Sequence, residues 1–486
     1  MAEQTLEQIR KVRLEKAEKL RKLGINPYPS KTKGNPIKIS HAKDQMEQQV
    51  EVAGRIMGWR EHGNVIFADL KDESGQIQLL FQKNNLGDDF KQLKLFDVGD
   101  FLYAKGKVTK TAAGEVSIDV AEFQILTKSI RPLPSKWHGL KDEEQRYRQR
   151  YVDLLMNKDL IDLFRKKAKF WQSIRDFLLN KGFLEVETPV LETTAGGADA
   201  HPFVTHHDAL DIDLYLRISM GELWQKRLMV AGFEKVFEIG RQFRNEGISR
   251  EHLQDYTQME FYWAYANYED SMVLVEEMYK DVAAKTFGSL QFKIGRFDVD
   301  LGKQWEKIDY FQVILERTGI DIVSASVEDV INKLKEFGVE CESGETKARL
   351  IDTLWKHIRK DIAGPAFLIG HPVEVSPLAK RKDDKTDFVE RYQVILAGSE
   401  VGNGYSELND PSDQKIRFEE QQKMRDRGDL EAQMHDKDFV RALEYGMPPT
   451  TGFGVSERLF AFLADKPIRE TVLFPLLRPE RDDKTK

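Results

Sequence analysis

A charged loop between two apolar strands, residues 237–262, constrains this chain more than any other segment. The segment reads FEIGRQFRNEGISREHLQDYTQMEFY. Its two ends have the apolar and aromatic texture of half-buried strands. The loop and the return strand carry Arg244, Glu246, His252 and Glu260. The pattern predicts a hairpin at a sheet edge, either as a charged surface feature or as a binding site for an anionic ligand with a planar base.

Composition limits the class of protein. A chain of 486 residues can form two or three domains, and 41% hydrophobic with 32% charged residues is typical of a globular protein. The net charge of -7 requires local basic patches for any nucleic-acid partner. The single cysteine, Cys341, excludes an internal disulfide and fits a reducing cytoplasm. We expect no membrane span and no secretory signal.

The N-terminal region, residues 1–45, is predicted to contain one helix at residues 5–23 and a linker. Leucine, isoleucine and valine recur at helical spacing, and Gly24 marks the end of the helix. Basic side chains cover most of its length, which favours either a solvated face or contact with RNA phosphates. These residues are Arg10, Lys11, Arg13, Lys16, Lys19, Arg21 and Lys22.

Residues 46–130 contain five short strand-like runs, most of them separated by glycine or polar turns. This density of short strands predicts a five-stranded oligonucleotide-binding barrel. Phe67 and Gln78 belong to neighbouring runs and share a face, with Arg60 and Glu115 as candidates beside them. Phe67 is either a core residue or a ring on which a base stacks.

Residues 131–159 are predicted to form a hinge, and residues 160–486 one large domain with a helical insertion at about 305–360. Strands and helices do not alternate regularly, which favours an α+β fold. The glycine-rich loops of Rossmann and P-loop nucleotide sites are missing from the sequence. The last predicted elements are a helix and a short apolar strand.

Charged residues gather on or beside three strand-like segments of this domain. Two arginines from distant segments suit a polyphosphate, because guanidinium groups match phosphate oxygens. Carboxylates beside them suit Mg²⁺, which takes one or two carboxylates together with substrate phosphates. The pattern indicates nucleotide chemistry that depends on positioning and charge neutralisation. The three groups are Arg244, Glu246, His252 and Glu260; Glu400, Asn403, Tyr405 and Glu407; and Arg458.

Three segments resemble the signature motifs of class II aminoacyl-tRNA synthetases: GFLEVETPVL motif 1, FRNEGISREH motif 2 and GFGVSERLF motif 3. Further segments are similar to lysyl-tRNA synthetases of the bacterial type, among them HPVEVSPLAKR and EVGNGYSELND. The resemblance implies an anticodon-binding barrel and a catalytic domain with an antiparallel sheet flanked by helices. It also implies ATP-dependent lysine activation, transfer to lysine tRNA, Mg²⁺, and a cytoplasmic homodimer formed through motif 1.

The resemblance implies roles for individual residues. For ATP, Arg244 would hold the α-phosphate, Glu246 would read the adenine amino group and Tyr256 would stack on the ring. His252 would lie near the β- and γ-phosphates, Arg458 would hold the γ-phosphate, and Glu400 would be a Mg²⁺ ligand. The anticodon would be read by Arg60, Phe67, Gln78 and Glu115. The lysine-binding residues would be Gly197, Glu222, Glu260, Tyr262, Asn403, Tyr405 and Glu407.

The lysine preference has a physical rationale, because an ε-ammonium group pairs with the carboxylates of Glu222 and Glu407. For Glu407 the alternative is a structural salt bridge. Three departures from the family pattern stand out. Gln393 replaces a usual metal-binding carboxylate, RISMGELW is one residue longer than usual, and GFGVSER is one residue shorter.

Three rival functions remain open at this point. The first is a synthetase for aspartate or asparagine, which shares the architecture but needs a different charge in the amino-acid pocket. The second is a relative that attaches lysine to a protein, although such relatives generally lack the barrel. The third is an RNA-binding module without catalytic activity.

Overall fold

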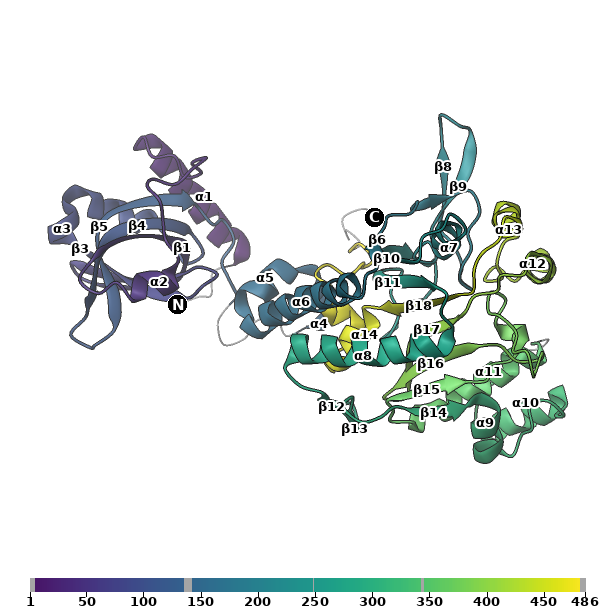
Figure 1. The fold of residues 1–486 in the computed structure, drawn as a ribbon. Coiled ribbons are helices and arrows are strands. Elements are labelled where there is room, and N and C mark those ends of the chain that lie inside the picture. Colours follow the sequence, from purple (N-terminus) through teal and green to yellow (C-terminus); the bar gives the residue numbers. More distant parts are fainter. Residues whose placement is uncertain (1–4, 135–141, 248, 342–344, 481–486) are drawn as a thin grey trace. The chain divides into compact units, whose positions relative to one another are not determined.

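The computed structural model describes residues 5–134, 142–247, 249–341 and 345–480. The chain forms two compact units, Met1–Met156 and Asn157–Lys486 (Figure 1). The boundary lies inside the segment expected to be a hinge. Two short helices, α4 (Glu143–Arg148) and α5 (Arg150–Met156), end the first unit.

The first unit is built around a closed barrel of five strands in the order β1-β2-β3-β5-β4. All pairs are antiparallel except β3 with β5. Alternate side chains such as Val52, Leu79 and Val120 fill its interior. The prediction of a five-stranded oligonucleotide-binding barrel is confirmed. The strands are β1 (Gln49–His62), β2 (Val65–Lys71), β3 (Gln76–Gln82), β4 (Phe101–Lys110) and β5 (Val116–Thr127).

Helix α1 (Leu6–Lys22) packs against this barrel and begins with a capping box formed by Thr5 and Gln8. Arg13 is buried and donates to the backbone oxygens of Val98, Ser129 and Arg131 at 3.1–3.2 Å. Arg13 therefore anchors the helix and is not available to a phosphate. Most of the other basic residues of the helix are exposed, and only these remain candidates for RNA contact.

An eight-stranded sheet forms the centre of the second unit, in the order β14-β15-β16-β17-β18-β11-β10-β6. The six inner strands are antiparallel, as predicted, and one parallel strand closes each edge. The α+β prediction is confirmed. The strands are β6 (Leu184–Glu185), β10 (Lys235–Phe243), β11 (Asp255–Ala264), β14 (Glu306–Asp309), β15 (Ala366–Ile369), β16 (Arg391–Leu396), β17 (Ser399–Ser406) and β18 (Thr450–Ser456).

Helices α6 (Lys158–Asn180), α8 (Tyr268–Phe287) and α14 (Arg458–Leu463) share one apolar core with the sheet (Figure 1). Met259 and Phe261 of β11 point into this core. Because successive side chains of a strand alternate, their neighbours on β11 point to the opposite face. That opposite face carries the polar site described below.

The predicted insertion contains β14 and three helices, α9 (Tyr310–Thr318), α10 (Val327–Glu336) and α11 (Lys347–Ile358). They enclose a separate core that includes Leu334, Leu350 and Trp355. The remaining elements are α2 (Ile39–Lys43), α3 (Lys83–Leu86), η1 (Gly87–Leu95), α7 (Glu222–Val230), η2 (Arg359–Asp361), η3 (Val373–Val375), α12 (Pro411–Asp426), α13 (Lys437–Glu444) and η4 (Ile468–Thr471).

Some short elements differ from the prediction. A three-stranded sheet of β7 (Leu191–Glu192), β9 (Ile212–Leu216) and β8 (Val204–His207) and a hairpin of β12 (Gln291–Ile294) and β13 (Phe297–Asp300) were only partly foreseen. The predicted apolar strand near the end is wrong, because residues 472–480 form no regular element. Two prolines in that run oppose strand pairing.

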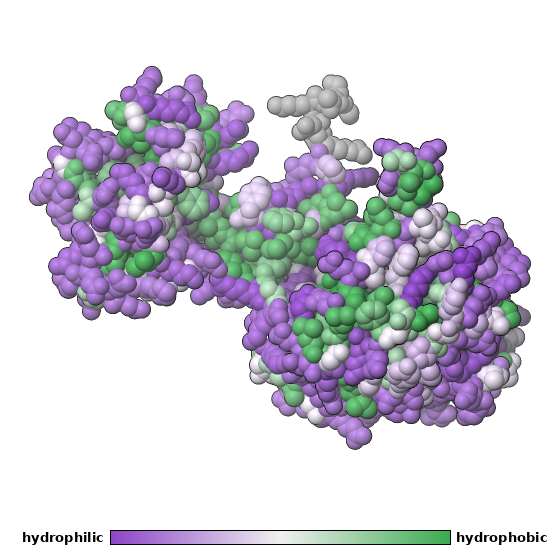
Figure 2. Space-filling model, turned by 45° about the horizontal axis from the view of Figure 1, so that its top comes forward, coloured by the Kyte–Doolittle hydropathy of each residue, from purple (hydrophilic) through white to green (hydrophobic). Residues whose placement is uncertain are grey.

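Hydrophilic residues cover most of the visible face of the molecule, with small apolar patches between them (Figure 2). Apolar side chains are exposed on β6, β7 and the projecting β8–β9 hairpin: Leu184, Val190, Leu191, Val204, Leu210 and Ile212. Within the described residues, no helix has the length and apolarity that a membrane crossing requires.

Candidate active site

The polar face of the eight-stranded sheet forms the floor of a cavity of about 1040 Å³. Side chains from β11, β16, β17, β18, α7 and α11 line it. Most of the residues singled out in the sequence lie there together: Gly197, Glu222, Arg244, Tyr256, Glu260, Tyr262, Gln393, Glu400, Asn403, Tyr405, Glu407 and Arg458. Glu246 and His252 lie on the adjoining β10–β11 loop and are not among the lining residues.

The β10–β11 hairpin places Arg244 at one end of the cavity. Its backbone N–H donates to the Gln254 carbonyl at 2.7 Å, and its Nε donates to the Ile218 carbonyl at 3.3 Å. The guanidinium carbon lies 5.8 Å from the centre of the Tyr256 ring. Arg244 is therefore oriented by backbone acceptors while its charge lies beside an aromatic face.

Two loop residues have shifted proton affinities. Burial raises the pKa of the half-buried Glu246 carboxyl, with the Arg244 charge acting in the opposite direction. Desolvation and then the Arg458 charge lower the pKa of His252, whose Nδ1 lies 2.7 Å from the Ser249 hydroxyl. His252 is therefore neutral near pH 7 and acts as a polar group and not as a cation.

Arg458 begins helix α14 and already has an anionic partner. Its Nη2 donates to Glu251 Oε2 at 2.8 Å and to the Ser399 hydroxyl at 2.6 Å. The Ser399 hydroxyl donates to the same Glu251 oxygen at 2.8 Å. The sequence analysis missed Glu251, although this residue directly precedes His252 in the charged loop. Arg458 keeps its place in the cavity despite the shortened GFGVSER run.

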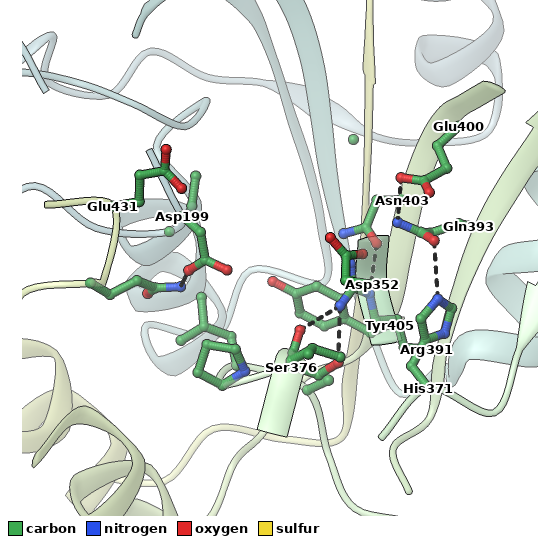
Figure 3. A pocket seen from close by; sticks show the side chains of 18 of the residues that line it. Asp199, Asp352, His371, Ser376, Arg391, Gln393, Glu400, Asn403, Tyr405 and Glu431 are labelled. Carbon is green, nitrogen blue, oxygen red and sulfur yellow. Dashed lines mark hydrogen bonds between the residues drawn. The ribbon is translucent and has the colours of Figure 1, made fainter. Parts of the chain in front are cut away.

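Glu400 accepts hydrogen bonds on both carboxylate oxygens, and Figure 3 shows the one from Gln393. The Trp355 indole donates to Oε1 at 2.9 Å and the Gln393 amide donates to Oε2 at 3.0 Å. The amide oxygen of Gln393 lies 3.1 Å from His371 Nε2. Burial lowers the pKa of His371 to about 3, so this imidazole is neutral. Arg359 adds a positive charge, with its Nε 3.4 Å from Glu400.

Glu222, Glu260 and Glu407 lie close together and form an acidic end of the cavity. Glu260 accepts from the Met220 backbone at 3.0 Å, from the Gln258 amide at 2.6 Å and from the Tyr262 hydroxyl at 3.1 Å. Burial, followed by the nearby Glu222 charge, raises the pKa of Glu260 to about 7. Burial likewise raises the pKa of Glu407 well above its usual range.

Lys226 lies among these acidic groups and was also missed by the sequence analysis. Its ammonium Nζ lies 2.7 Å from Glu222 Oε1 and 2.5 Å from Glu407 Oε2. Glu407 therefore does form a salt bridge, and it also lines the cavity. The only signal in the sequence was the helical i,i+4 spacing of Glu222 and Lys226.

The middle of the cavity is fixed by Arg391, a third residue missed from the sequence. Its Nε donates to Asn403 Oδ1 at 2.9 Å, and its Nη1 donates to the Val375 carbonyl at 2.7 Å and to the Ser376 hydroxyl at 2.9 Å (Figure 3). With its oxygen held by Arg391, Asn403 can present its NH₂ group to a ligand.

Two glycines fit where no side chain would. Gly197 has φ +85°, and a Cβ there would lie 2.5 Å from the Ser219 hydroxyl. Gly221 has φ +67°, and a Cβ there would lie 1.9 Å from the Thr188 hydroxyl. Gly221 belongs to the lengthened RISMGELW run and immediately precedes helix α7. The longer run is therefore accommodated by this tight turn, and Glu222 still lines the cavity.

The four barrel candidates share one face of the first unit. Phe67 is half-buried and pairs in register with Arg60, as Gln78 does with Asp69. Arg60 forms a two-pronged ion pair with Asp69 at 3.0 Å. The Gln78 amide donates to Glu115 at 2.7 Å and accepts from Ser117 at 2.8 Å. These contacts leave Phe67 as the face's aromatic surface for stacking.

Comparison with protein families defines the class to which this fold and cavity belong. Residues 50–126 match the OB-fold nucleic acid binding domain of the anticodon-binding type. Residues 142–478 match the class II tRNA synthetases for D, K and N. The barrel and the cavity-bearing sheet thus correspond to the two domains of such an enzyme.

Individual relatives narrow the assignment. The lysine–tRNA ligase of Carboxydothermus hydrogenoformans is 45% identical, covering 99% of this chain and 100% of the relative. The lysine–tRNA ligase of Moorella thermoacetica is 44% identical, covering 97% of this chain and 98% of the relative. The lysine–tRNA ligase of Thermotoga maritima is 43% identical, covering 98% of this chain and 97% of the relative. The chain belongs to the lysine–tRNA ligase family of class II tRNA synthetases.

Proposed function

We propose that the chain attaches lysine to lysine tRNA in two steps. A carboxylate oxygen of lysine attacks the α-phosphorus of ATP, and the bond to the leaving pyrophosphate breaks. A hydroxyl at the 3′ end of the tRNA then attacks the lysyl carbonyl carbon and AMP leaves. The observation that carries this proposal is the acidic end of the cavity, where Glu222, Glu260 and Glu407 line one wall.

ATP would occupy the end of the cavity that holds the two arginines. Arg244 would neutralise the charge that develops on the α-phosphate, and Tyr256 would stack on adenine. Glu246 would accept from the adenine amino group, and neutral His252 would lie near the β- and γ-phosphates. Arg458 would bind the γ-phosphate after leaving Glu251. No side chain is required as a nucleophile.

Lysine would occupy the acidic end, with its ammonium group facing Glu222 and Glu407. Tyr262 and Tyr405 line this end, and Glu260 lies beside them. Asn403 would contact the substrate carboxylate through its NH₂ group. Gly197 would let the backbone approach the ligand. The neighbouring rings and the burial of these groups make the pairing selective for a cation.

Mg²⁺ would be held by Glu400 together with the substrate phosphates, since this ion needs only one or two carboxylates. Its chemistry there is to neutralise phosphate charge. Gln393 directs its amide N–H toward Glu400 and its oxygen toward His371, so it supplies no second carboxylate. The described residues contain no cluster of three histidine, cysteine, aspartate or glutamate residues suited to a metal. The donor set therefore fits a metal bound chiefly through ATP.

The barrel would bind the anticodon, with a base stacked on Phe67 and with Arg60, Gln78 and Glu115 at the base edges. The exposed basic residues of α1 would add phosphate contacts. The exposed apolar residues of β6, β7 and the β8–β9 hairpin lie around the motif 1 segment, and they support a homodimer formed through this surface. A reducing cytoplasm suits the single cysteine.

The amino-acid dependence of ATP–pyrophosphate exchange tests the proposed reaction. Lysine should support exchange, and norleucine, which lacks the ε-ammonium, should support it at about 10⁴-fold lower kcat/KM, because it leaves buried carboxylates unpaired. Aspartate and asparagine serve as the comparison substrates. Exchange with aspartate and none with lysine would contradict the proposal.

Arg244→Ala should lower kcat for exchange roughly 10²–10³-fold, because the charge on the α-phosphate loses its fixed partner. Filter binding should show unchanged affinity for lysine tRNA. Arg241→Ala is the matched control, since Arg241 lies on β10 shortly before Arg244, pairs with Asp255 and is not among the cavity-lining residues. If Arg244→Ala catalysed ATP–pyrophosphate exchange with an unaltered kcat, the proposed role of Arg244 would be wrong.

Phe67→Ala should raise KM for lysine tRNA in aminoacylation, because a stacked base contributes about 1–3 kcal/mol. Exchange measured without tRNA should not change. Phe67→Tyr keeps the ring and should keep the tRNA affinity. Equal KM values for all three proteins would refute a stacking role for Phe67.

Glu251→Gln should lower KM for ATP about two- to tenfold, because Arg458 loses a competing carboxylate with which it forms a partly buried ion pair. KM for lysine should remain the same. Glu277→Gln is the control, because Glu277 lies on α8 and forms an ion pair with Lys181. A higher KM for ATP in Glu251→Gln would show that Glu251 assists ATP and does not compete with it.

A further inference from the structure

Lys226 has an unusual position for a charged side chain. It lies on helix α7 and is 1% exposed. The cavity-lining residues include Glu222 and Glu407 but not Lys226, so its ammonium lies behind the carboxylate wall. The mechanism above uses the two carboxylates and leaves this buried cation without a role.

Lys226 connects two carboxylates from different parts of the fold. Glu222 begins helix α7, whereas Glu407 follows strand β17. Lys226 contacts Oε1 of Glu222 at 2.7 Å and Oε2 of Glu407 at 2.5 Å. Each carboxylate therefore has its second oxygen left for a ligand. Gly452 makes room there, since a Cβ at that position would lie 2.3 Å from Glu407 Oε1.

Aromatic rings surround the Lys226 ammonium, which is almost fully shielded from solvent. The rings of Tyr262, Tyr405 and Phe439 lie 5.4–6.0 Å from Lys226 Nζ, within the range of cation–π attraction. The titratable groups around Glu407 are Lys226 and Glu222 from α7, Glu260 and Tyr262 from β11, and Tyr405 from β17. Lys226 is the one positive charge among them.

We propose that Lys226 is a positioning residue for amino-acid recognition. Its ammonium holds Glu222 and Glu407 at a fixed separation, so that the pair receives the ammonium group of the substrate. This role rests on the proposed lysine ligase function. Three carboxyl groups surround this one internal ammonium, so the site can still attract the ammonium groups of a lysine substrate.

The pH dependence follows from the charges. Burial raises the pKa of Glu407, and the Lys226 ammonium is the largest opposing influence. Without Lys226 the pKa of Glu407 would be higher still, so its carboxyl group would hold the proton to a higher pH. Substrate binding would then improve with increasing pH, until the substrate itself begins to lose its protons.

The test is Lys226→Met in the full chain, measured by ATP–pyrophosphate exchange. KM for lysine should rise about tenfold or more at pH 7 and recover as the pH is raised toward about 9, while KM for ATP stays the same. The unaltered chain should show a smaller fall in KM for lysine over the same pH range than Lys226→Met does.

Lys128→Met is the matched control. Lys128 is 2% exposed and pairs with Asp97 and Asp100 in the other unit, so it reproduces the loss of a buried, ion-paired lysine. This variant should keep the unaltered KM for lysine and its pH dependence. Thermal unfolding of both variants measures the purely structural cost.

Two results with Lys226→Met would overturn the proposed role: an unaltered KM for lysine, or a raised KM that does not respond to pH. If that variant does not fold, Lys226→Arg takes its place, and an unaltered KM for lysine in that variant would overturn the role as well. Absence of any lysine-dependent exchange in the unaltered chain would refute the ligase function itself, which distinguishes the two failures.

Discussion

The alternation of side chains along one strand divides the second unit into a core and a site. Met259 and Phe261 of β11 join the helices in a shared apolar core, and Gln258, Glu260 and Tyr262 face the cavity. The core fixes the backbone on which the polar side chains are mounted, and a buried polar group retains its geometry only on a rigid support. Strand β18 repeats this arrangement, with Val455 in the core and glycines at 452 and 454 leaving space over the cavity floor.

The cavity built on this sheet brings together groups of opposite charge. Arg244 and Arg458 line it, and so do Glu222, Glu260 and Glu407. ATP and lysine carry the complementary charges, so in the proposed reaction each substrate would be attracted to one of these groups and repelled from the other. The reacting carboxylate and α-phosphate would then meet between them, beside Asn403. Bringing two reactants together in this way is a major source of rate enhancement.

Much of the fold was predictable from the sequence, because strand alternation, helical spacing and glycine or proline turns are local signals. The five barrel strands, the β10–β11 hairpin and the insertion helices follow from them. Two-residue strands such as β6 and β7 are too short to show an alternation of side chains. The apolar residues 472–476 indicated a strand that the fold does not form. The strand and charge pattern indicated candidates such as Phe67 and Arg244, and the motif resemblance added others such as Gly197 and Glu222. The spatial grouping of these residues could only be seen in the folded chain.

The three residues missed in the sequence, Lys226, Glu251 and Arg391, share a physical character that explains the omission. Lys226 and Glu251 each act through a partner that is distant in the chain, whereas the partners of Arg391 are 12–16 residues away. None of the three carries a distinctive motif. Lys226 lies against Glu407 and Glu251 against Arg458, 181 and 207 residues away. On a single helix or loop, such residues have the pattern of ordinary surface charges.

Lys226 and Glu251 also show how a charged site remains stable within a fold. A buried charge without a partner is costly. Glu222 and Glu407 are therefore paired with an internal ammonium, and Arg458 with an internal carboxylate. The two internal ions, Lys226 and Glu251, have different effects on substrate binding. Lys226 lies behind the cavity wall and can remain when a substrate ammonium arrives, whereas Glu251 occupies the guanidinium group that a phosphate would need. In the proposed reaction the first arrangement would favour binding of the amino acid, and the second would oppose binding of the nucleotide while Glu251 remains paired with Arg458.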